Sequence, residues 1–445
     1  MGSPFTSELA RRAMVLRAKD LPADVTELAR QCVLDWFGVT LAGSREDAAT
    51  IVADELSADA GSGRATVLGR SLVLTPRDAA LANGTASHAL DYDDVNQAML
   101  GHPTVPILPA LLALAEERGA SGSEVLTAFV AGYEAECAVA RALGGEHYQR
   151  GFHATATAGT FGSAVACSRL LALDPDRAEM AIGIAATQAA GLKSMFGTMC
   201  KPLHAGLAST AGLLAARLAD RGFTAARESI ETIQGFGETH SSSFDADRGL
   251  AEPKGGWYLR SHLFKYHAAC YETHSSIEAL RRIRASAELT PEEVETVTIH
   301  ADAAQMRMCA IEHPSTGLET KFSLRHTAAL VLSGFDTASI GVFGDAQARD
   351  PALVAMRNRV TVVADRPSGG PTPVEVRTRD GRLLHGAHDV AVPETDLPAQ
   401  SRRLRGKFEA LAVPLAGRRA TRIAELVEAL EGLDNVRPLM EAARG

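Results

Sequence analysis

The sequence has few aromatic residues, no long apolar run and no excess of positive charge, and each absence excludes a class of protein. Phe, Trp and Tyr make up only 5% of the 445 residues, whereas aromatic and β-branched side chains are enriched in β-sheets. The many alanines and glycines instead favour closely packed helices. The formal net charge of −9 argues against a nucleic-acid-binding protein, which would carry a basic patch. We therefore expect a mainly helical protein without a nucleic-acid partner.

Targeting and membrane-spanning segments are also missing. The first residues, MGSPFTSELARRAM, lack the apolar core of a signal peptide, and no run of about 18 apolar residues follows them. The 6 cysteines are scattered without a C-x-x-C pair, which argues against a zinc or iron–sulfur site with closely spaced ligands. We expect a complete cytoplasmic chain with reduced thiols and no membrane partner.

Signature motifs of three common enzyme classes are absent as well. The chain contains no G-x-S-x-G elbow, no G-x-x-x-x-G-K-[ST] loop and no G-x-G-x-x-G after a predicted strand. These absences argue against a hydrolase of the nucleophile-elbow type, a P-loop nucleotidase and a dinucleotide-dependent oxidoreductase.

Helix signals follow one another through the first 260 residues or so. Apolar residues recur at helical spacing after Pro22 and stop at Gly43. The stretch Thr75-Pro76-Arg77-Asp78 is a helix start, Ser121-Gly122-Ser123-Glu124 is a capping box, and Asp174-Pro175 opens a further helix. We expect these helices to end near Ala89, Leu143 and Leu192.

After His274 the pattern changes to a mixture of strands and helices. The expected strands are 294–299, 359–363, 374–377 and 382–385, the last two forming a hairpin about the turn 379–381. The expected helices are 321–333 and 351–357, followed near the C-terminus by 420–430 and 436–443. The predicted fold class is mainly α with a second α+β domain: a helical domain of residues 1–265, completed by 399–445, and a smaller α+β domain of residues 266–398.

The stretch GTMCKPLHAG, residues 197–206, places a lysine and a histidine at the start of an otherwise apolar helix. Pro202 suits the first helical position, so Lys201 is expected at the cap and His204 one turn along the same side. Unpaired backbone N–H groups and the positive end of the helix dipole would attract a carboxylate there. The alternative is a solvated lysine beside a core histidine.

A second cluster combines carboxylates with imidazoles. The stretch HALDYDD, residues 88–94, precedes Gly101-His102-Pro103 at the end of a predicted helix. Three interpretations are open: a divalent metal site, although no H-E-x-x-H or EF-hand spacing is present; an acid–base site in which His102 titrates and Asp91 orients it; and a helix C-terminus with capping acids.

Two further histidine stretches complete the set. His153 lies at the start of a glycine- and alanine-rich helix, where the dipole disfavours its cation and leaves a neutral imidazole that can accept a proton. A structural role for His153 is an equally good interpretation. The stretch from Lys265 to His274 lies at the predicted domain junction, where ligand sites are common.

The motifs HALDYDD, GHP, GFHATATAGTFG, GTMCKPLHAG and KYHAACYETH, in this order, resemble the MmgE/PrpD family, which includes 2-methylcitrate dehydratases, cis-aconitate decarboxylases and iminodisuccinate epimerases. The resemblance extends over almost the whole chain. It implies a large all-helical domain, a smaller α/β lid domain, a homodimer, and activity without a metal or an organic cofactor.

The resemblance also implies the site residues. Family members place residues like five of this chain around the active site, namely Asp91, His102, His153, Lys201 and Lys265. We expect three more side chains to bind a small anionic di- or tricarboxylate alongside the two lysines, namely Tyr92, His204 and His274. The first five, the residues expected around the active site, should line one pocket.

The three family reactions share a chemical need. Each develops negative charge at a carbon next to a carboxyl group, so the site needs a base and cations placed in advance. We expect Lys201 and Lys265 to hold carboxylates. We expect one of His102 and His153 to move the proton, with Asp91 orienting or charging its histidine partner.

The choice among these reactions depends on a departure from the family patterns. Cys270 occupies the position of a histidine in the decarboxylase pattern, and Ala268-Ala269-Cys270 replaces a Pro-Ala-Glu-type segment of the dehydratase pattern. We predict a cofactor-independent, dehydratase-like lyase, with epimerase, decarboxylase and a carboxylate-binding protein without catalysis as alternatives. The smaller domain is expected to move as a lid, with hinges near 260–265 and 397–401.

Overall fold

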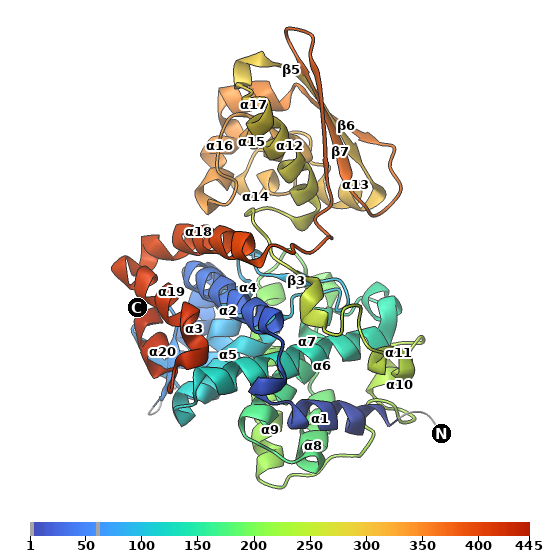
Figure 1. Ribbon diagram of the computed structural model, residues 1–445, viewed down its shortest axis with the longest axis vertical. Coiled ribbons are helices and arrows are strands. Elements are labelled where there is room, and N and C mark those ends of the chain that lie inside the picture. Colours follow the sequence, from blue (N-terminus) through green and yellow to red (C-terminus); the bar gives the residue numbers. More distant parts are fainter. Residues whose placement is uncertain (1–3, 59–62) are drawn as a thin grey trace. The chain divides into compact units, whose positions relative to one another are not determined.

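A computed structural model describes residues 4–58 and 63–445 and divides the chain into two compact units. Unit 1 comprises Met1–Phe264 with Glu394–Gly445, and unit 2 comprises Lys265–Pro393. The domain limits inferred from the sequence are residues 265 and 398. Figure 1 shows helices throughout unit 1 and a sheet with helices in unit 2, so the predicted fold class, mainly α with a second α+β domain, is confirmed.

Unit 1 contains helices from both ends of the chain. They are α1 (Phe5–Val15), α2 (Ala23–Gly43), α3 (Asp47–Ala58), α4 (Pro76–His88), α5 (Thr104–Arg118), α6 (Gly122–Gln149), α7 (Ala154–Leu170), α8 (Pro175–Ala186), α9 (Cys200–Asp220), α10 (Phe236–His240), α11 (Ala246–Leu250), α18 (Leu397–Ala416), α19 (Arg418–Glu428) and α20 (Arg437–Ala443). Two short antiparallel pairs accompany them, β1 (Ala65–Val67) with β2 (Leu72–Leu74) and β3 (Val95–Asn96) with β4 (His262–Leu263).

The predicted helix starts rest on side-chain caps that the structure contains. The Thr75 hydroxyl accepts a hydrogen bond from the Asp78 N–H at the start of α4, at 3.3 Å. At the start of α6, Ser121 and Glu124 each bond the other's backbone N–H, at 3.2 and 2.8 Å. Each cap satisfies an N–H group that lacks a partner within the helix, which fixes where the helix begins.

The core of unit 1 is organised around α7. Of its 17 residues, 16 are buried, and the helix packs against α5, α6, α8 and α9. Glycine and alanine allow this close packing: a Cβ at Gly132 of α6 would lie 2.8 Å from the Ala166 Cβ of α7. A helix that is buried on all sides gives His153, the residue immediately before it, a rigid support.

Several expected boundaries in unit 1 were wrong. Helix α9 begins at Cys200, so Lys201 lies in the first turn rather than at the cap, which is Met199. Helix α8 ends at Ala186 rather than near Leu192, and α6 continues past Leu143 to Gln149 across a non-helical residue, Gly144. The strands β1 to β4 were not predicted, because segments of 2 or 3 residues carry no periodic pattern.

Unit 2 contains a mixed sheet in the order β6-β5-β7-β8. Its strands are β5 (Val294–Ala301), β6 (Val360–Ala364), β7 (Thr372–Thr378) and β8 (Leu383–His388). β5 pairs in parallel with β6 and antiparallel with β7, which forms a hairpin with β8. The parallel pair needs a long connection, and the helices between residues 302 and 359 supply it.

The helices of unit 2 are only partly those that the sequence predicted. They are α12 (His274–Ser286), α13 (Ala303–Cys309), α14 (Gly317–Thr320), α15 (Leu324–Leu332), α16 (Asp345–Arg349) and α17 (Pro351–Arg357). The expected helices at 321–333 and 351–357 correspond to α15 and α17, whereas α12 was missed. Figure 1 shows α12 and α15 on one side of the sheet. No helix in residues 4–58 and 63–445 combines the length and apolar character needed to cross a bilayer.

Candidate active site

The candidate site is built on the loop between α4 and α5, which begins directly after His88. Within this loop Asp91 adopts a left-handed backbone conformation, with φ of 52°, which aspartate tolerates better than most residues. Such conformations persist only where the surrounding structure enforces them, and they gather at functional sites. The predicted position of this motif, where a helix gives way to a loop, is confirmed.

Buried polar contacts hold the loop in place. Lys407 of α18 donates to the Tyr92 carbonyl at 2.9 Å and pairs with Asp35 of α2 at 2.6 Å. The Asp94 carboxylate accepts from the backbone N–H of Thr104 at 3.3 Å and from its hydroxyl. These contacts tie the loop to α2, α5 and α18, so its carboxylates are positioned by rigid helices.

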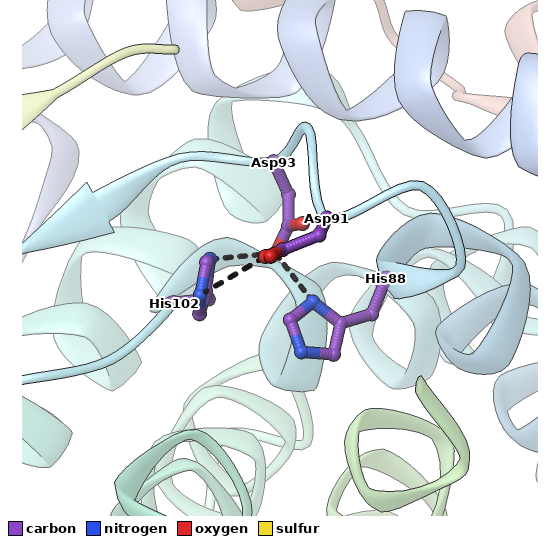
Figure 2. Close-up of side chains that lie close together, drawn as sticks. All are labelled: His88, Asp91, Asp93 and His102. Atoms are coloured by element: carbon purple, nitrogen blue, oxygen red, sulfur yellow. Dashed lines mark hydrogen bonds and ion pairs between the residues drawn. The ribbon is translucent and has the colours of Figure 1, made fainter. Parts of the chain in front are cut away.

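Asp93 lies between two imidazoles (Figure 2). Its Oδ2 is 2.8 Å from Nδ1 of His88 and 3.0 Å from Nδ1 of His102, and Asp93 and His88 are both 1% exposed. A carboxylate oxygen shared by two Nδ1 atoms favours the N–H form at both of them. The Nε2 atoms of His88 and His102 are then available to accept a proton.

The protonation states of Asp93 and His88 follow from their burial and from the charged groups beside them. Burial would raise the pKa of Asp93, but the neighbouring His102 and His88 outweigh it and hold the pKa well below its usual range. Burial lowers the pKa of His88 to about 4 despite the nearby Asp93. Asp93 is therefore an anion and His88 a neutral imidazole at pH 7.

Asp91 links the lysine to the second histidine. Its Oδ1 lies 2.8 Å from Nζ of Lys201 and 3.6 Å from Nε2 of His102. The side chain of Asp91 is 43% exposed, and those of Lys201 and His102 are 15% and 12% exposed. An ammonium group and an imidazole thus face the same carboxylate with part of their surface open to a ligand.

His153 and His204 form a second pair of imidazoles. Their Nδ1 atoms lie 3.1 Å apart, and the two residues are 2% and 9% exposed. The ring of His153 stacks on that of His88 at 5.7 Å and meets the edge of Phe196 at 4.9 Å. Burial is the main cause that lowers the pKa of His153 well below its usual value, and the nearby Lys201 ammonium lowers it further. The expectation of a neutral imidazole at this helix start agrees with that direction.

The first turn of α9 reaches the cluster because α4 and α9 pack unusually closely. A Cβ at Gly84 would lie 2.6 Å from Cα of Gly206, and a Cβ at Gly206 would contact the Leu81 carbonyl oxygen. Only glycine at both positions permits this approach. Lys201 and His204 are brought beside the α4 loop for that reason.

A metal site at the same cluster needs a separate test. His88, Asp91, Asp93 and His102 each place one possible ligand atom within 4.8 Å of the others. However, Oδ2 of Asp93 already lies against two Nδ1 atoms, and the Lys201 ammonium lies 2.8 Å from Asp91 Oδ1. A positive charge so close to a ligand atom repels a second cation, so the arrangement fits an anionic ligand better than a divalent ion.

Four of the five predicted catalytic residues come together in unit 1, although as many as 110 positions separate Asp91 and Lys201 in the chain. Lys265 and His274 belong to unit 2, where each is 2% exposed. Burial, followed by the charges of His267 and Lys265, lowers the pKa of His274 well below its usual value. The roles of Lys265 and His274 toward a substrate stay predictions.

Tyr92 was also expected to bind substrate. It is 1% exposed, and Nζ of Lys407 lies 4.0 Å from its ring centroid. Its predicted contact with substrate stays a prediction, whereas its backbone carbonyl has a clear function in anchoring the loop.

The roles of His88, Asp93 and Phe196 were not assigned from the sequence. His88 and Asp93 lie within the HALDYDD motif, but their pairing depends on a chain reversal that places residues 88 and 93 opposite each other. Phe196 lies beyond the predicted end of α8, in the segment before α9 and directly after a short 3₁₀ turn, Lys193–Met195. Histidine spacing within the motif was the only available signal.

Family profiles match both parts of the chain. The MmgE/PrpD N-terminal domain profile matches residues 7–248, and the MmgE/PrpD C-terminal domain profile matches residues 267–432. The chain belongs to the MmgE/PrpD family. The resemblance inferred from the five motifs is confirmed.

Several curated MmgE/PrpD relatives are named cis-aconitate decarboxylases. The Aspergillus terreus enzyme is 30% identical over 296 residues, which is 63% of this chain and 60% of the relative. The cis-aconitate decarboxylase-like protein oryM of Aspergillus oryzae is 30% identical over 295 residues, 63% of this chain and 61% of the relative. The mouse enzyme is 26% identical over 450 residues, 97% of this chain and 91% of the relative. The matches thus span about 60% of the two fungal relatives and nearly all of the mouse protein.

Proposed function

We propose that this chain is a lyase that acts without a cofactor next to a carboxyl group of a small di- or tricarboxylate. The observation that carries the proposal is the Lys201 ammonium, 2.8 Å from Asp91 and on the same carboxylate as His102. It provides a cation for a substrate carboxylate beside imidazoles that can exchange a proton. The names of the relatives make cis-aconitate the first substrate to test.

In the proposed chemistry a lysine stabilises negative charge and an imidazole transfers a proton. In decarboxylation the bond between carbon and a carboxylate breaks, carbon dioxide leaves, and the electron pair stays on the carbon. Lys201 stabilises the charge that spreads onto a neighbouring carboxylate, because preorganised cations act most strongly where charge develops. An imidazole, His102 or His153, then delivers a proton to the carbon. Dehydration uses the same groups in the order proton removal, then loss of hydroxide as water.

Cys270 is the reason to keep dehydration and epimerisation as alternatives. It is partly buried in unit 2 and stands where the decarboxylase pattern carries a histidine. The homodimer, the contribution of Lys265 and the lid motion are further parts of the proposal that rest on the family resemblance alone.

One experiment separates these reactions. The purified protein is incubated with cis-aconitate, citrate, 2-methylcitrate and iminodisuccinate in deuterium oxide and followed by proton NMR. Decarboxylation predicts loss of cis-aconitate, release of carbon dioxide and a product that carries solvent deuterium. New vinyl protons from citrate or 2-methylcitrate would identify a dehydratase, and deuterium uptake without net conversion an epimerase. No change in any of the four compounds would contradict the proposal.

A further inference from the structure

His204 was expected to contact the substrate, but its surroundings point to a different function. Its Nδ1 forms a hydrogen bond with Nδ1 of His153, at 3.1 Å. On its other side His204 lines an open surface cavity of about 570 Å³ in unit 1. His153, by contrast, stacks on His88 within the candidate active site. His204 therefore lies between the proton-exchanging imidazole and solvent.

The walls of this cavity are mainly apolar. Leu192, Met195, Leu207 and Leu214 line it, and Arg77 is its charged residue among those that the structure describes. Such a cavity has room for water or a small base but offers no carboxylate of its own to hold a proton. The imidazole of His204 is the acid–base group that this cavity presents.

The hydrogen bond between the rings also constrains their tautomers. Burial lowers the pKa of His204, as it does that of His153, so both rings are neutral at pH 7. A hydrogen bond between two Nδ1 atoms then requires one N–H and one lone pair. The rings must hold opposite tautomers, with the second proton of the pair on Nε2 of the ring that accepts.

We propose that His204 is a positioning residue that passes protons between His153 and the solvent in this cavity. The inference rests on the proposed function, since it concerns the proton that His153 exchanges with substrate carbon. When His153 gives the proton on its Nε2 to the carbon, the proton on Nδ1 of His204 moves to Nδ1 of His153. Nε2 of His204 then takes a proton from water in the cavity.

The number of protons on the two rings is the same before and after the transfer. Before transfer His153 carries its proton on Nε2 and His204 carries its proton on Nδ1, shared with His153. Afterwards His153 carries the proton on Nδ1, received across the 3.1 Å bond, and His204 carries a new one on Nε2 taken from water, which leaves hydroxide. Both rings are neutral at the start and the end, so the transfer needs no buried cation, which the low pKa values disfavour.

The geometry of α9 links this step to substrate binding. Lys201 and His204 are three residues apart in its first turn, hence on one side of the helix. Gly191, with φ of 147°, passes close to both rings: a Cβ there would lie 3.5 Å from Nδ1 of His204 and 3.6 Å from Cβ of His153. The first turn of α9 thus carries both Lys201, which binds a substrate carboxylate, and His204, which passes the proton.

Kinetics of three variants test the proposal on the substrate that the wild-type protein converts. His204→Ala should lower kcat by about 100-fold, the lower end of the usual acid–base contribution, with KM unchanged, and added imidazole should restore kcat by entering the enlarged cavity. His204→Asn, which retains a polar group near Nδ1 but cannot pass a proton, should be as slow as His204→Ala. His240→Ala removes a half-exposed histidine elsewhere in unit 1 and should behave like wild type.

Other kinetic results would overturn the proposal. A normal kcat in His204→Asn would mean that the hydrogen bond only orients His153. A raised KM with unchanged kcat would reinstate His204 as a substrate-binding residue. Failure of imidazole to rescue a folded His204→Ala would exclude proton transfer through this position.

A measurement without substrate separates this inference from the proposed function. With ¹⁵N-labelled histidine, the ring nitrogens of the wild-type protein report tautomers directly. We expect two neutral rings of opposite tautomer for His153 and His204 at pH 7; equal tautomers, or a charged ring, would overturn the relay. If the wild-type protein converts no polycarboxylate while the tautomers are opposite, the proposed function fails and the hydrogen-bonded pair stands.

Discussion

Replacing Lys201 by methionine removes one positive charge from the site and keeps a side chain of similar length. Nζ of Lys201 lies 2.8 Å from Oδ1 of Asp91, and the two side chains are 15% and 43% exposed. Partly exposed ion pairs contribute about 0–1 kcal/mol to folding. We therefore expect the free energy of unfolding of Lys201→Met to change by less than about 1 kcal/mol.

The effect on substrate is much larger. A hydrogen bond to a charged group contributes about 1.5–3 kcal/mol, and about 1.4 kcal/mol corresponds to a factor of ten. If Lys201 holds a carboxylate equally in the ground and transition states, KM rises roughly 10- to 150-fold. If it also stabilises charge that develops during the reaction, kcat falls by a further factor of about 100 to 1,000.

Steady-state kinetics with the substrate found by NMR measure both effects, and urea unfolding measures the stability. Lys193→Met is a matched control: Nζ of Lys193 donates to the Tyr148 carbonyl at 3.0 Å and lies 3.5 Å from the Tyr148 ring centroid. We expect near-normal kinetics for Lys193→Met. Wild-type kcat and KM in a folded Lys201→Met would refute the assignment of Lys201.

Further predictions concern the Asp93 carboxylate, the contact between α4 and α9, the dependence of stability on pH, and metal ions. Asp93→Asn should lower kcat by up to about 10⁴-fold, the loss seen when a histidine takes the wrong tautomer. A normal kcat would show that Asp93 does not set the tautomers of His88 and His102. Gly206→Ala should lower the free energy of unfolding by about 1–3 kcal/mol in urea titrations, because its Cβ meets the α4 backbone. Burial lowers the pKa values of His88, His147 and His262 to about 4, 4 and 3. Below pH 6.5 the unfolded chain therefore binds more protons than the folded chain. The free energy of unfolding should be highest above pH 6.5 and should fall toward pH 4, by at most about 4 kcal/mol per pH unit for the three histidines together. A constant urea midpoint from pH 7.5 to 5 would contradict this dependence on pH. Exhaustive chelation should leave activity intact, whereas loss and rescue by one divalent ion would support the metal site.

The sequence predicted the helix starts of unit 1 well because caps are local. The Thr75 cap and the capping box of Ser121 and Glu124 depend on residues three positions apart, and the structure contains both. Helix ends were less predictable. Helix α8 stops at Ala186 although an apolar pattern continues to Leu192. The segment that follows lies against the chain at His153, whose N–H donates to the Gly191 carbonyl at 3.0 Å.

The strands of unit 2 were predicted from β-branched runs and a turn, but their order was not. That β6 pairs with β5, and not with β7, depends on the crossover through residues 302–359. Helix α12 was missed although its polar and apolar faces are distinct, since its first residue, His274, was interpreted as the last residue of the site motif 265–274. A chemical interpretation of a motif can hide an ordinary helix start.

The members of the candidate site could be predicted from the motifs, but not their pairing. Asp91 was expected to serve a histidine, and the structure places it 2.8 Å from Lys201 and 3.6 Å from Nε2 of His102. Asp93 instead lies against Nδ1 of His102, at 3.0 Å. The two carboxylates differ because Asp91 has a positive φ and turns outward while Asp93 is buried. A backbone angle of one residue is not readable from composition or spacing.

The central claim is that the Lys201 and His102 side chains share a carboxylate-binding site that carries out acid–base chemistry. A crystal structure with a bound, unreactive tricarboxylate tests it most directly. The account predicts one ligand carboxylate within hydrogen-bonding distance of Nζ of Lys201, and the reacting carbon next to a ring nitrogen of His102 or His153. A ligand bound at another place on the protein, or a metal ion between Asp91 and Asp93 in the liganded site, would contradict it.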